Sequence, residues 1–308
     1  MMLEADPAGI EQAARILSDG GLVAVPTETV YGLAARADRA EAVGGIYRAK
    51  GRPSFNPLIV HVADLSAASA LAQLDANAEA LAEAFWPGPL TMVLPRQDDA
   101  VLAPAVSAGL PTLAIRCPAH PVMRALLPLC DFPLAAPSAN ASGSVSPTRA
   151  AHVVASLGDR IDAVLDGGAC EAGLESTIVA LREEGQWQVL RPGPVTPGQI
   201  AKIIGSRSSD PGREGIEAPG QMASHYAPGK PLRLNARTGE PDEFHIGFGK
   251  ETGDFSLSLS GDLDEAATRL YDALHAAASS PKTRISVSPI PERGIGIAIN
   301  DRLSRAAS

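Results

Sequence analysis

Short apolar runs alternate with amphipathic stretches along the first two thirds of the chain. A helix is predicted after Asp6-Pro7, where a capping residue precedes apolar positions at helical spacing up to Gly20-Gly21. Because predicted helices and strands alternate while the later strands follow one another closely, the pattern predicts an α/β domain over 1–204, with a twisted mixed sheet and flanking helices. The remaining helices are predicted at 38–50, within 64–86, and at 121–127, 148–157 and 197–204, and the strands at 22–25, 57–62, 89–94, 112–116, 134–136, 161–165, 176–181 and 187–190.

This alternation breaks after residue 204. Residues 205–220 are rich in Ser, Gly, Pro, Arg and Asp and show no apolar period, which predicts a linker that we extend to residue 230. We therefore expect a second, small α/β domain over 231–308, built in three layers. Its strands are predicted at 232–234, 243–248 and 285–287, and its helices at 262–277 and from 297 to the end.

Composition narrows the class of protein. The 308 residues are 45% hydrophobic, with a mean hydropathy of +0.05, which is enough apolar material for a full core. A net charge of −9 argues against non-specific nucleic-acid binding, which requires a broad basic face, but it permits a local cationic pocket. The three cysteines form no CxxC pair, and no segment has the pattern of a secretion signal or a membrane span. We therefore expect a cytoplasmic protein with reduced cysteines and no membrane partner.

Candidate chemistry begins with two polar loops in the first third of the chain. Thr27-Glu28-Thr29 follows the predicted strand 22–25, at the edge where α/β sheets bind ligands, although threonines also cap turns. Lys50 and Arg52 lie within one turn after a predicted helix. An arginine fork grips phosphate oxygens and a lysine adds a point charge, yet such a pair alone is most often a solvated helix end.

Nearby polar residues favour a binding site over a solvated helix end. Asn56 and His61 follow the two cations, and His61 lies inside an apolar strand, either as a substrate contact or as a core histidine. Arg116 and Arg191 each end a predicted strand, so that with Lys50 and Arg52 they could form a pocket for a multiply charged anion. A hydroxyl-rich loop directly after strand 134–136 could wrap phosphate oxygens, and it contains Ser138, Asn140, Ser142, Ser144 and Ser146.

Several familiar catalytic motifs are absent from the sequence. There is no GxxxxGK[ST], no GxGxxG, no GxSxG and no HExxH. If the pocket binds ATP, it does so outside the common nucleotide-binding loops.

Four motifs in a fixed order carry a resemblance to a known family. TETVYGL at 27–33, KGRP at 50–53, NPLIVH at 56–61 and PSAN at 137–140 resemble the YrdC-type domain of threonylcarbamoyl-AMP synthases. The resemblance covers about residues 5–200. The long form of that family adds a linker and a small Rossmann-like α/β domain, and residues 205–308 are similar to that plan.

The resemblance implies an ATP-dependent nucleotidyltransferase. Such an enzyme condenses L-threonine, bicarbonate and ATP, with Mg²⁺ on the triphosphate, and releases pyrophosphate. Its product feeds threonylcarbamoyladenosine formation in tRNA through a separate transferase, and we expect no direct tRNA binding. By resemblance, Lys50 and Arg52 would be catalytic. Threonine would be held by Thr29, His61, Arg116, Ala136 and Ser176, and ATP by Lys50, Arg52, Asn56, Thr112, Ser138, Asn140, Ser146, Arg191 and Tyr226.

One segment departs from the family pattern. Family linkers carry basic residues just before the His-Tyr pair, where this chain has Gln221-Met222-Ala223-Ser224 before His225 and Tyr226. Closure of Tyr226 over the nucleotide would then be weaker or differently timed.

Two rival functions are carbamoyl transfer, which would turn over ATP without threonine, and an RNA-binding module without catalysis, which the net negative charge of the chain disfavours.

Overall fold

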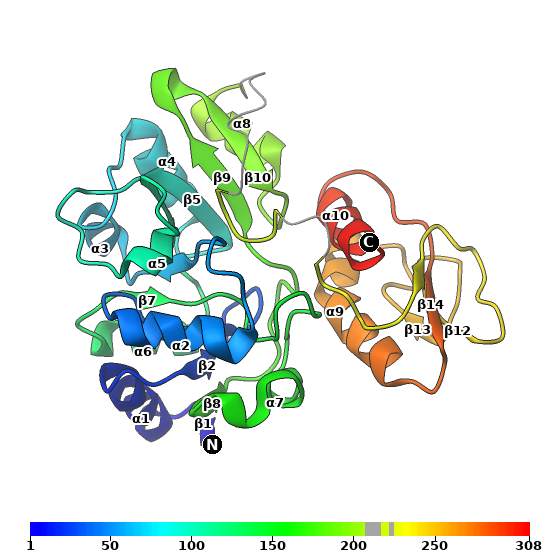
Figure 1. Ribbon diagram of the computed structural model, residues 1–308. Coiled ribbons are helices and arrows are strands. Elements are labelled where there is room, and N and C mark those ends of the chain that lie inside the picture. The colour runs from blue at the N-terminus through cyan, green and yellow to red at the C-terminus, as the bar shows by residue number, and fades with distance from the viewer. Residues whose placement is uncertain (207–216, 222–224) are drawn as a thin grey trace.

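Two separate β-sheets divide the chain into two domains that lie side by side (Figure 1). This computed structural model describes residues 1–206, 217–221 and 225–308. The parts of the predicted linker at 207–216 and 222–224, including Met222, lie outside the described residues. None of the helices in the described part of the chain combines the length and apolar character that a membrane span needs.

The first domain contains ten strands and eight α-helices among its described residues. The strands are β1 Met2–Glu4, β2 Val23–Val25, β3 Gly32–Arg36, β4 Ile59–His61, β5 Leu90–Pro95, β6 Thr112–Arg116, β7 Leu134–Ala135, β8 Ala163–Asp166, β9 Thr177–Leu181 and β10 Trp187–Arg191. The helices are α1 Pro7–Ser18, α2 Ala40–Lys50, α3 Leu65–Ser69, α4 Ala76–Phe85, α5 Pro104–Ser107, α6 Pro121–Leu126, α7 Ala150–Leu157 and α8 Pro197–Ile204.

The sheet of the first domain is mixed, as predicted. Its order is β1-β8-β2-β3-β7-β4-β6-β5-β9-β10. The pairs β1–β8, β2–β8, β4–β6 and β5–β9 are parallel, and the other neighbours are antiparallel. The parallel pair β4–β6 places His61 opposite Arg116, at the carboxyl ends of both strands. The sheet therefore brings together two polar side chains that are 55 positions apart in the sequence.

Local signals explain where the helices begin and end. The Asp6 carboxylate accepts a hydrogen bond from the Gly9 amide at the start of α1, and Thr196 forms a capping box with Gln199 at the start of α8. Helix α2 ends at Gly51, whose φ of +61° lies in the left-handed region that glycine adopts at little cost. This turn separates Lys50 from Arg52 and sends their side chains in different directions.

The sequence pattern missed β1, β3 and α5 in the first domain, and a short strand at Phe255–Ser256 in the second. Strand β3 was not predicted because the polar motif before it was interpreted as a loop, whereas it forms the tight connection of an antiparallel β2–β3 pair. In that connection, Thr27 Oγ1 donates to the Val30 carbonyl and accepts from the amides of Thr29 and Val30. The threonine thus does cap a turn, and the same turn sets Thr29 at the pocket described below.

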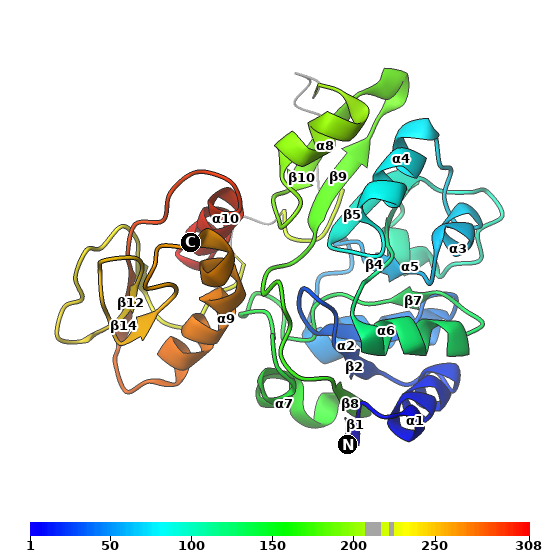
Figure 2. The ribbon, with the colours of Figure 1, turned by 180° about the vertical axis from the view of Figure 1, so that it is seen from behind.

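The second domain has a parallel sheet in the order β11-β14-β12-β13. Both of its helices lie on the sheet face that is turned toward the first domain (Figures 1 and 2), so that this domain has two layers and the expected third layer is wrong. Its elements are β11 Leu232–Arg233, β12 Glu243–Gly247, β13 Phe255–Ser256, α9 Leu263–Ser279, β14 Arg284–Val287 and α10 Gly296–Ala306.

The two domains pack through a shared apolar cluster and polar contacts. Val30, Val145 and Leu174 of the first domain are buried in the same cluster as the apolar residues of α9 and α10. At the edge of this interface, Arg149 pairs with Asp272 at 2.8 Å. Because the interface contains buried apolar side chains, we expect the domains to hold a fixed relative position.

Candidate active site

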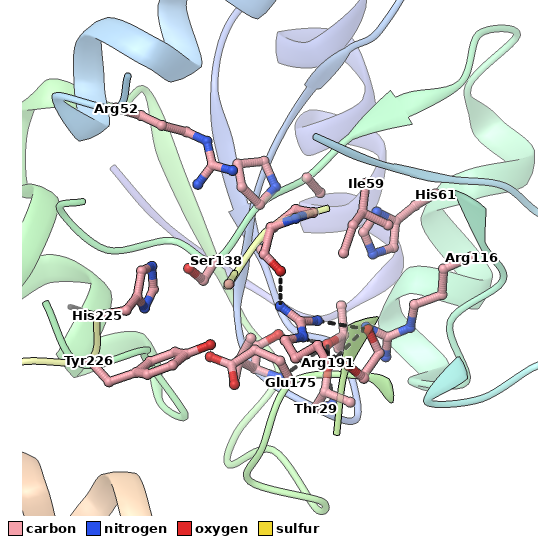
Figure 3. A pocket seen from close by; sticks show the side chains of 18 residues that line it. Thr29, Arg52, Ile59, His61, Arg116, Ser138, Glu175, Arg191, His225 and Tyr226 are labelled. Carbon is pink, nitrogen blue, oxygen red and sulfur yellow. Dashed lines mark hydrogen bonds between the residues drawn. The ribbon is translucent and has the colours of Figure 1, made fainter. Parts of the chain in front are cut away.

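A narrow pocket lies at the carboxyl ends of β4 and β6 and is closed on one side by linker residues (Figure 3). Its cavity volume is about 40 Å³. The first domain and the linker meet around it. Its lining comprises Thr27, Thr29, Val30, Gly32, Arg52, Ile59, His61, Arg116, Ala136, Pro137, Ser138, Glu175, Ser176, Arg191, Pro219, Gly220, His225 and Tyr226.

The Arg116 guanidinium is a buried cation of the pocket that is held by three hydrogen bonds. Its Nη2 donates to Glu28 Oε1 at 2.6 Å, its Nη1 to Thr29 Oγ1 at 2.9 Å and its Nε to the Gly88 carbonyl at 3.2 Å. The other Glu28 oxygen accepts from the Ala119 amide, and the charge of Arg116 holds the pKa of Glu28 below its usual value despite burial. Three of the five N–H groups are thus used, which leaves donors for a carboxylate of a ligand.

His61 lies next to Arg116 on the same side of the pocket in Figure 3, because the two residues are paired in register on β4 and β6. Burial, and to a lesser extent the charge of Arg116, lowers its pKa to about 3, so that the imidazole is neutral at physiological pH. Within the described residues, its Nδ1 is buried without a hydrogen-bond partner. A buried polar atom of this kind normally has a partner, which points to a ligand in the pocket.

Buried neutral histidines predict acid sensitivity of the fold. Burial lowers the pKa of His225 to about 3 as well, while an unfolded histidine titrates near about 6.5. The unfolded chain therefore binds more protons than the fold over this window, and the free energy of unfolding is expected to fall as pH drops from about 6.5 toward 3. Urea unfolding at about pH 7 and about pH 5 measures this loss. The loss should be smaller in His61→Gln, and an equal loss in both proteins would contradict the prediction.

Arg52 lies on the opposite wall of the pocket from Arg116. Its Nη2 donates to the Pro57 carbonyl at 2.9 Å and its Nε to the Asn56 carbonyl at 3.2 Å, which fix the guanidinium over the pocket. Burial lowers the pKa of Arg52 to about 10, so that it stays charged at neutral pH. Asn56 itself is buried behind Arg52 and does not line the pocket.

Lys50 does not lie over the pocket, which corrects its predicted place beside the phosphates. Its side chain is buried beneath the serine loop, where Nζ donates to the carbonyls of Ser138 at 2.6 Å and Asn140 at 2.5 Å. Burial and the neighbouring Arg52 lower its pKa. In this position Lys50 supports the loop from below.

The serine loop is held in shape by its own side chains. Asn140 Nδ2 donates to the carbonyls of Ala141 and Ser144, and Ser146 Oγ donates to Glu175 Oε1 at 2.5 Å. Ser138 faces the pocket, whereas Asn140 and Ser146 lie behind its wall. Two of the three predicted ATP residues of this loop thus shape the wall without lining it.

Arg191 and Ser176 form the floor of the pocket. Arg191 Nη2 donates to Ser176 Oγ at 3.1 Å, and that hydroxyl also shares a hydrogen bond of 2.7 Å with Thr91. Gly220 of the linker lies against this arginine: its φ is +86°, and a Cβ there would come within 2.8 Å of Arg191 Cδ. Only glycine lets the linker approach so closely.

Tyr226 closes the pocket from the linker side. Its ring is buried, packs edge-on against His225 and stacks at 5.8 Å from Tyr271 of the second domain. Its φ of +64° is uncommon for an aromatic residue, and such backbone conformations persist where the surroundings fix them.

The pocket contains all five residues that were predicted to bind threonine and four of the residues that were predicted to bind ATP. Thr112 is not among them: it lies at the other end of β6, where it lines a separate surface depression with Gln73 and Asp75. Glu175 and His225 line the pocket but were not predicted as site residues. His225 could have been predicted as a site residue from its position next to Tyr226 in the sequence.

The described residues hold no cluster of three or more His, Cys, Asp or Glu side chains that could bind a metal ion. Glu175, the carboxylate that lines the pocket, already accepts hydrogen bonds from Ser146, Tyr271 and Arg302. The donor set of the pocket therefore does not fit a metal held by the protein alone.

Comparisons with known proteins follow the two-domain division. Residues 15–193 match the Sua5–YciO–YrdC family, described as telomere recombination, and residues 195–308 match the family described as the threonylcarbamoyl-AMP synthase C-terminal domain. The threonylcarbamoyl-AMP synthase of Bacillus subtilis is 41% identical, covering 97% of this chain and 92% of that protein. That of Pyrococcus abyssi is 38% identical, covering 97% and 94%. The crystal structure of P. abyssi Sua5 complexed with L-threonine has a TM-score of 0.91 at 35% identity and covers 100% of this chain and 97% of that one.

Proposed function

Because this chain belongs to the threonylcarbamoyl-AMP synthase family, we propose that it condenses L-threonine, bicarbonate and ATP to threonylcarbamoyl-AMP and pyrophosphate. One feature of the pocket gives the main structural support for this proposal. A carboxylate anchor, formed by Arg116 and Thr29, shares one pocket with two further cations, Arg52 and Arg191. A small amino acid and a polyanion could thus be held next to each other.

We assign the two halves of the pocket to the two substrates. Arg116 would bind the threonine carboxylate, with Thr29, the neutral His61, Ser176 and the backbone at Ala136 around the rest of the amino acid. Arg52 and Arg191 would face the phosphates, with Ser138 at the serine loop and Tyr226 over the nucleotide. Lys50, Asn140 and Ser146 would act indirectly, by holding the loop that carries Ser138.

The proposed reaction uses no covalent intermediate on the protein. The threonine amine adds to CO₂ with loss of a proton, or to bicarbonate with loss of water, and the resulting N-carboxylate attacks the α-phosphorus, with pyrophosphate as the leaving group. The protein would contribute by positioning the reactants and by stabilising charge on the phosphate oxygens. Mg²⁺ would enter as part of the ATP complex, held by phosphate oxygens and water.

Entry of ATP requires movement of the linker. A cavity of about 40 Å³ accommodates little more than water, and Pro219, Gly220, His225 and Tyr226 form one of its walls. We infer that these residues withdraw to admit ATP and then close, which would limit hydrolysis of the adenylate. The product would pass to a separate tRNA threonylcarbamoyl transferase in the cytoplasm.

Pyrophosphate release tests the proposal. The purified full chain is supplied with ATP and Mg²⁺, and threonine and bicarbonate are added singly and together. Release that requires both is the expected result. Release without threonine would indicate carbamoyl or hydrolytic chemistry, and no release under any combination would favour a binding module.

A further inference from the structure

The second domain contacts a carboxylate that lines the pocket, that of Glu175. Its Oε2 accepts hydrogen bonds from Tyr271 Oη of α9 at 2.8 Å and from Arg302 Nε of α10 at 2.9 Å. Its Oε1 accepts from Ser146 of the serine loop. The carboxylate lies beside Tyr226 in Figure 3. A group that lines the pocket is therefore held by residues about 100 or more positions later in the chain.

An ionised carboxylate at this place opposes the binding of a polyanion. Glu175 is buried, and the charges of Arg302 and Arg191 and its hydrogen bonds lower its pKa to about 2 despite the desolvation. It is thus negatively charged at neutral pH, in the same pocket as Arg52 and Arg191. Without a neighbouring cation, its charge would cancel part of the field that these arginines present to phosphates.

Arg302 supplies that cation from outside the first domain. Its side chain is fully buried, and besides Glu175 it donates from Nη1 to Asp301 at 2.6 Å and from Nη2 to the Pro192 carbonyl at 2.9 Å. Pro192 directly follows Arg191. The guanidinium carbon also lies 5.3 Å from the centre of the Tyr226 ring. One side chain thus contacts the pocket carboxylate, the loop after Arg191 and the linker.

We propose that Arg302 is a positioning residue of the ATP half of the pocket, where it neutralises Glu175 and so allows the pocket to accept a polyanion. The second domain is then a part of the nucleotide site, although its own helices do not line the pocket. This inference rests on the proposed function, because it assumes that the polyanion is ATP.

Charge rescue tests this role. The affinity for Mg²⁺-ATP is measured by calorimetry, without threonine, for the full chain and for Arg302→Met, Glu175→Gln and the double variant. Arg302→Met should weaken binding at least about tenfold, because it leaves a buried carboxylate without its cation. Glu175→Gln should bind within about threefold of the unchanged chain or more tightly, since Arg302 keeps Asp301 as a partner. The double variant should return to the affinity of Glu175→Gln.

A matched control separates charge from damage to the interface. Arg149→Met removes an ion pair between the same two domains, with Asp272, that does not touch the pocket, and it should change the ATP affinity less than about threefold. A folded double variant that binds ATP as weakly as Arg302→Met would overturn the inference. If Arg302→Met does not fold, Glu175→Gln decides: unchanged or tighter binding supports the inference, and tenfold weaker binding overturns it.

The two proposals fail in different ways. If the unchanged chain neither binds ATP nor releases pyrophosphate, the proposed function is wrong. If it does both, and Arg302→Met binds ATP equally well, only the role of Arg302 is wrong.

Discussion

Replacement of Arg116 by methionine is expected to lower kcat/KM for L-threonine by about 10³-fold. The side chain is buried, and its guanidinium is fixed by Glu28, Thr29 and the Gly88 carbonyl before any ligand binds. Loss of a buried charge-assisted pair costs about 3–5 kcal/mol, or between two and four powers of ten in an equilibrium constant. Methionine would also leave the Glu28 carboxylate without its cation, and the uncompensated negative charge of Glu28 would repel the carboxylate of the ligand.

Pyrophosphate release at varied threonine concentration measures this loss, and the affinity for Mg²⁺-ATP is its internal control. Arg116→Met should change the ATP affinity less than about tenfold, because Arg52 and Arg191 remain in place. Arg116→Lys keeps the charge but not the fork and should recover part of the activity. A loss of threonine and ATP binding by the same factor would show that Arg116 supports the pocket as a whole and does not anchor the amino acid.

The sequence predicts well where Arg116 and His61 lie in the fold, because both are fixed by regular structure. The apolar runs at 57–62 and 112–116 predict two strands, and β4 and β6 lie at these places. A polar residue at the end of such a strand lies at the edge of the sheet, and its position does not depend on the conformation of the loops. Thr112 shows the limit of this reasoning, since the same strand that places Arg116 in the pocket places Thr112 at its far end.

The direction of a side chain after a helix is harder to predict. Lys50 and Arg52 are only two positions apart in the sequence and both are basic, yet only Arg52 faces the pocket, while Lys50 is turned under the serine loop. The difference depends on the left-handed turn at Gly51 and on carbonyl groups supplied by residues 138 and 140. Spacing alone contains neither piece of information.

Contacts between domains are absent from local patterns altogether. No local pattern marks Glu175 as a site residue, and its partner Arg302 follows 127 positions later, in a helix whose pattern indicates only an amphipathic surface. The same holds for the second domain as a whole: its alternating elements predict α/β structure, but they do not predict that both helices pack on one face of its sheet.

The second large effect is expected at Arg52. Arg52→Ala should lower kcat/KM for ATP by about 10²-fold or more, because a fixed cation facing the phosphates is worth several kcal/mol where charge develops in the transition state. Its guanidinium is held by the carbonyls of Asn56 and Pro57, so that little ordering is needed when the nucleotide binds. Pyrophosphate release at saturating threonine and bicarbonate measures the change.

Neighbouring cations provide the comparison that makes this prediction specific. Arg48 lies in the last turn of α2 but is exposed, and Arg48→Ala should stay within about twofold of the unchanged chain. Lys50→Met, which removes the support under the serine loop, should reduce activity together with the free energy of unfolding, because two buried carbonyls lose their donor. Arg52→Ala should reduce activity with a much smaller change in stability. Near-normal turnover in Arg52→Ala would show that Arg52 does not stabilise the phosphates, and Arg191 would then be the principal cation of that half of the pocket.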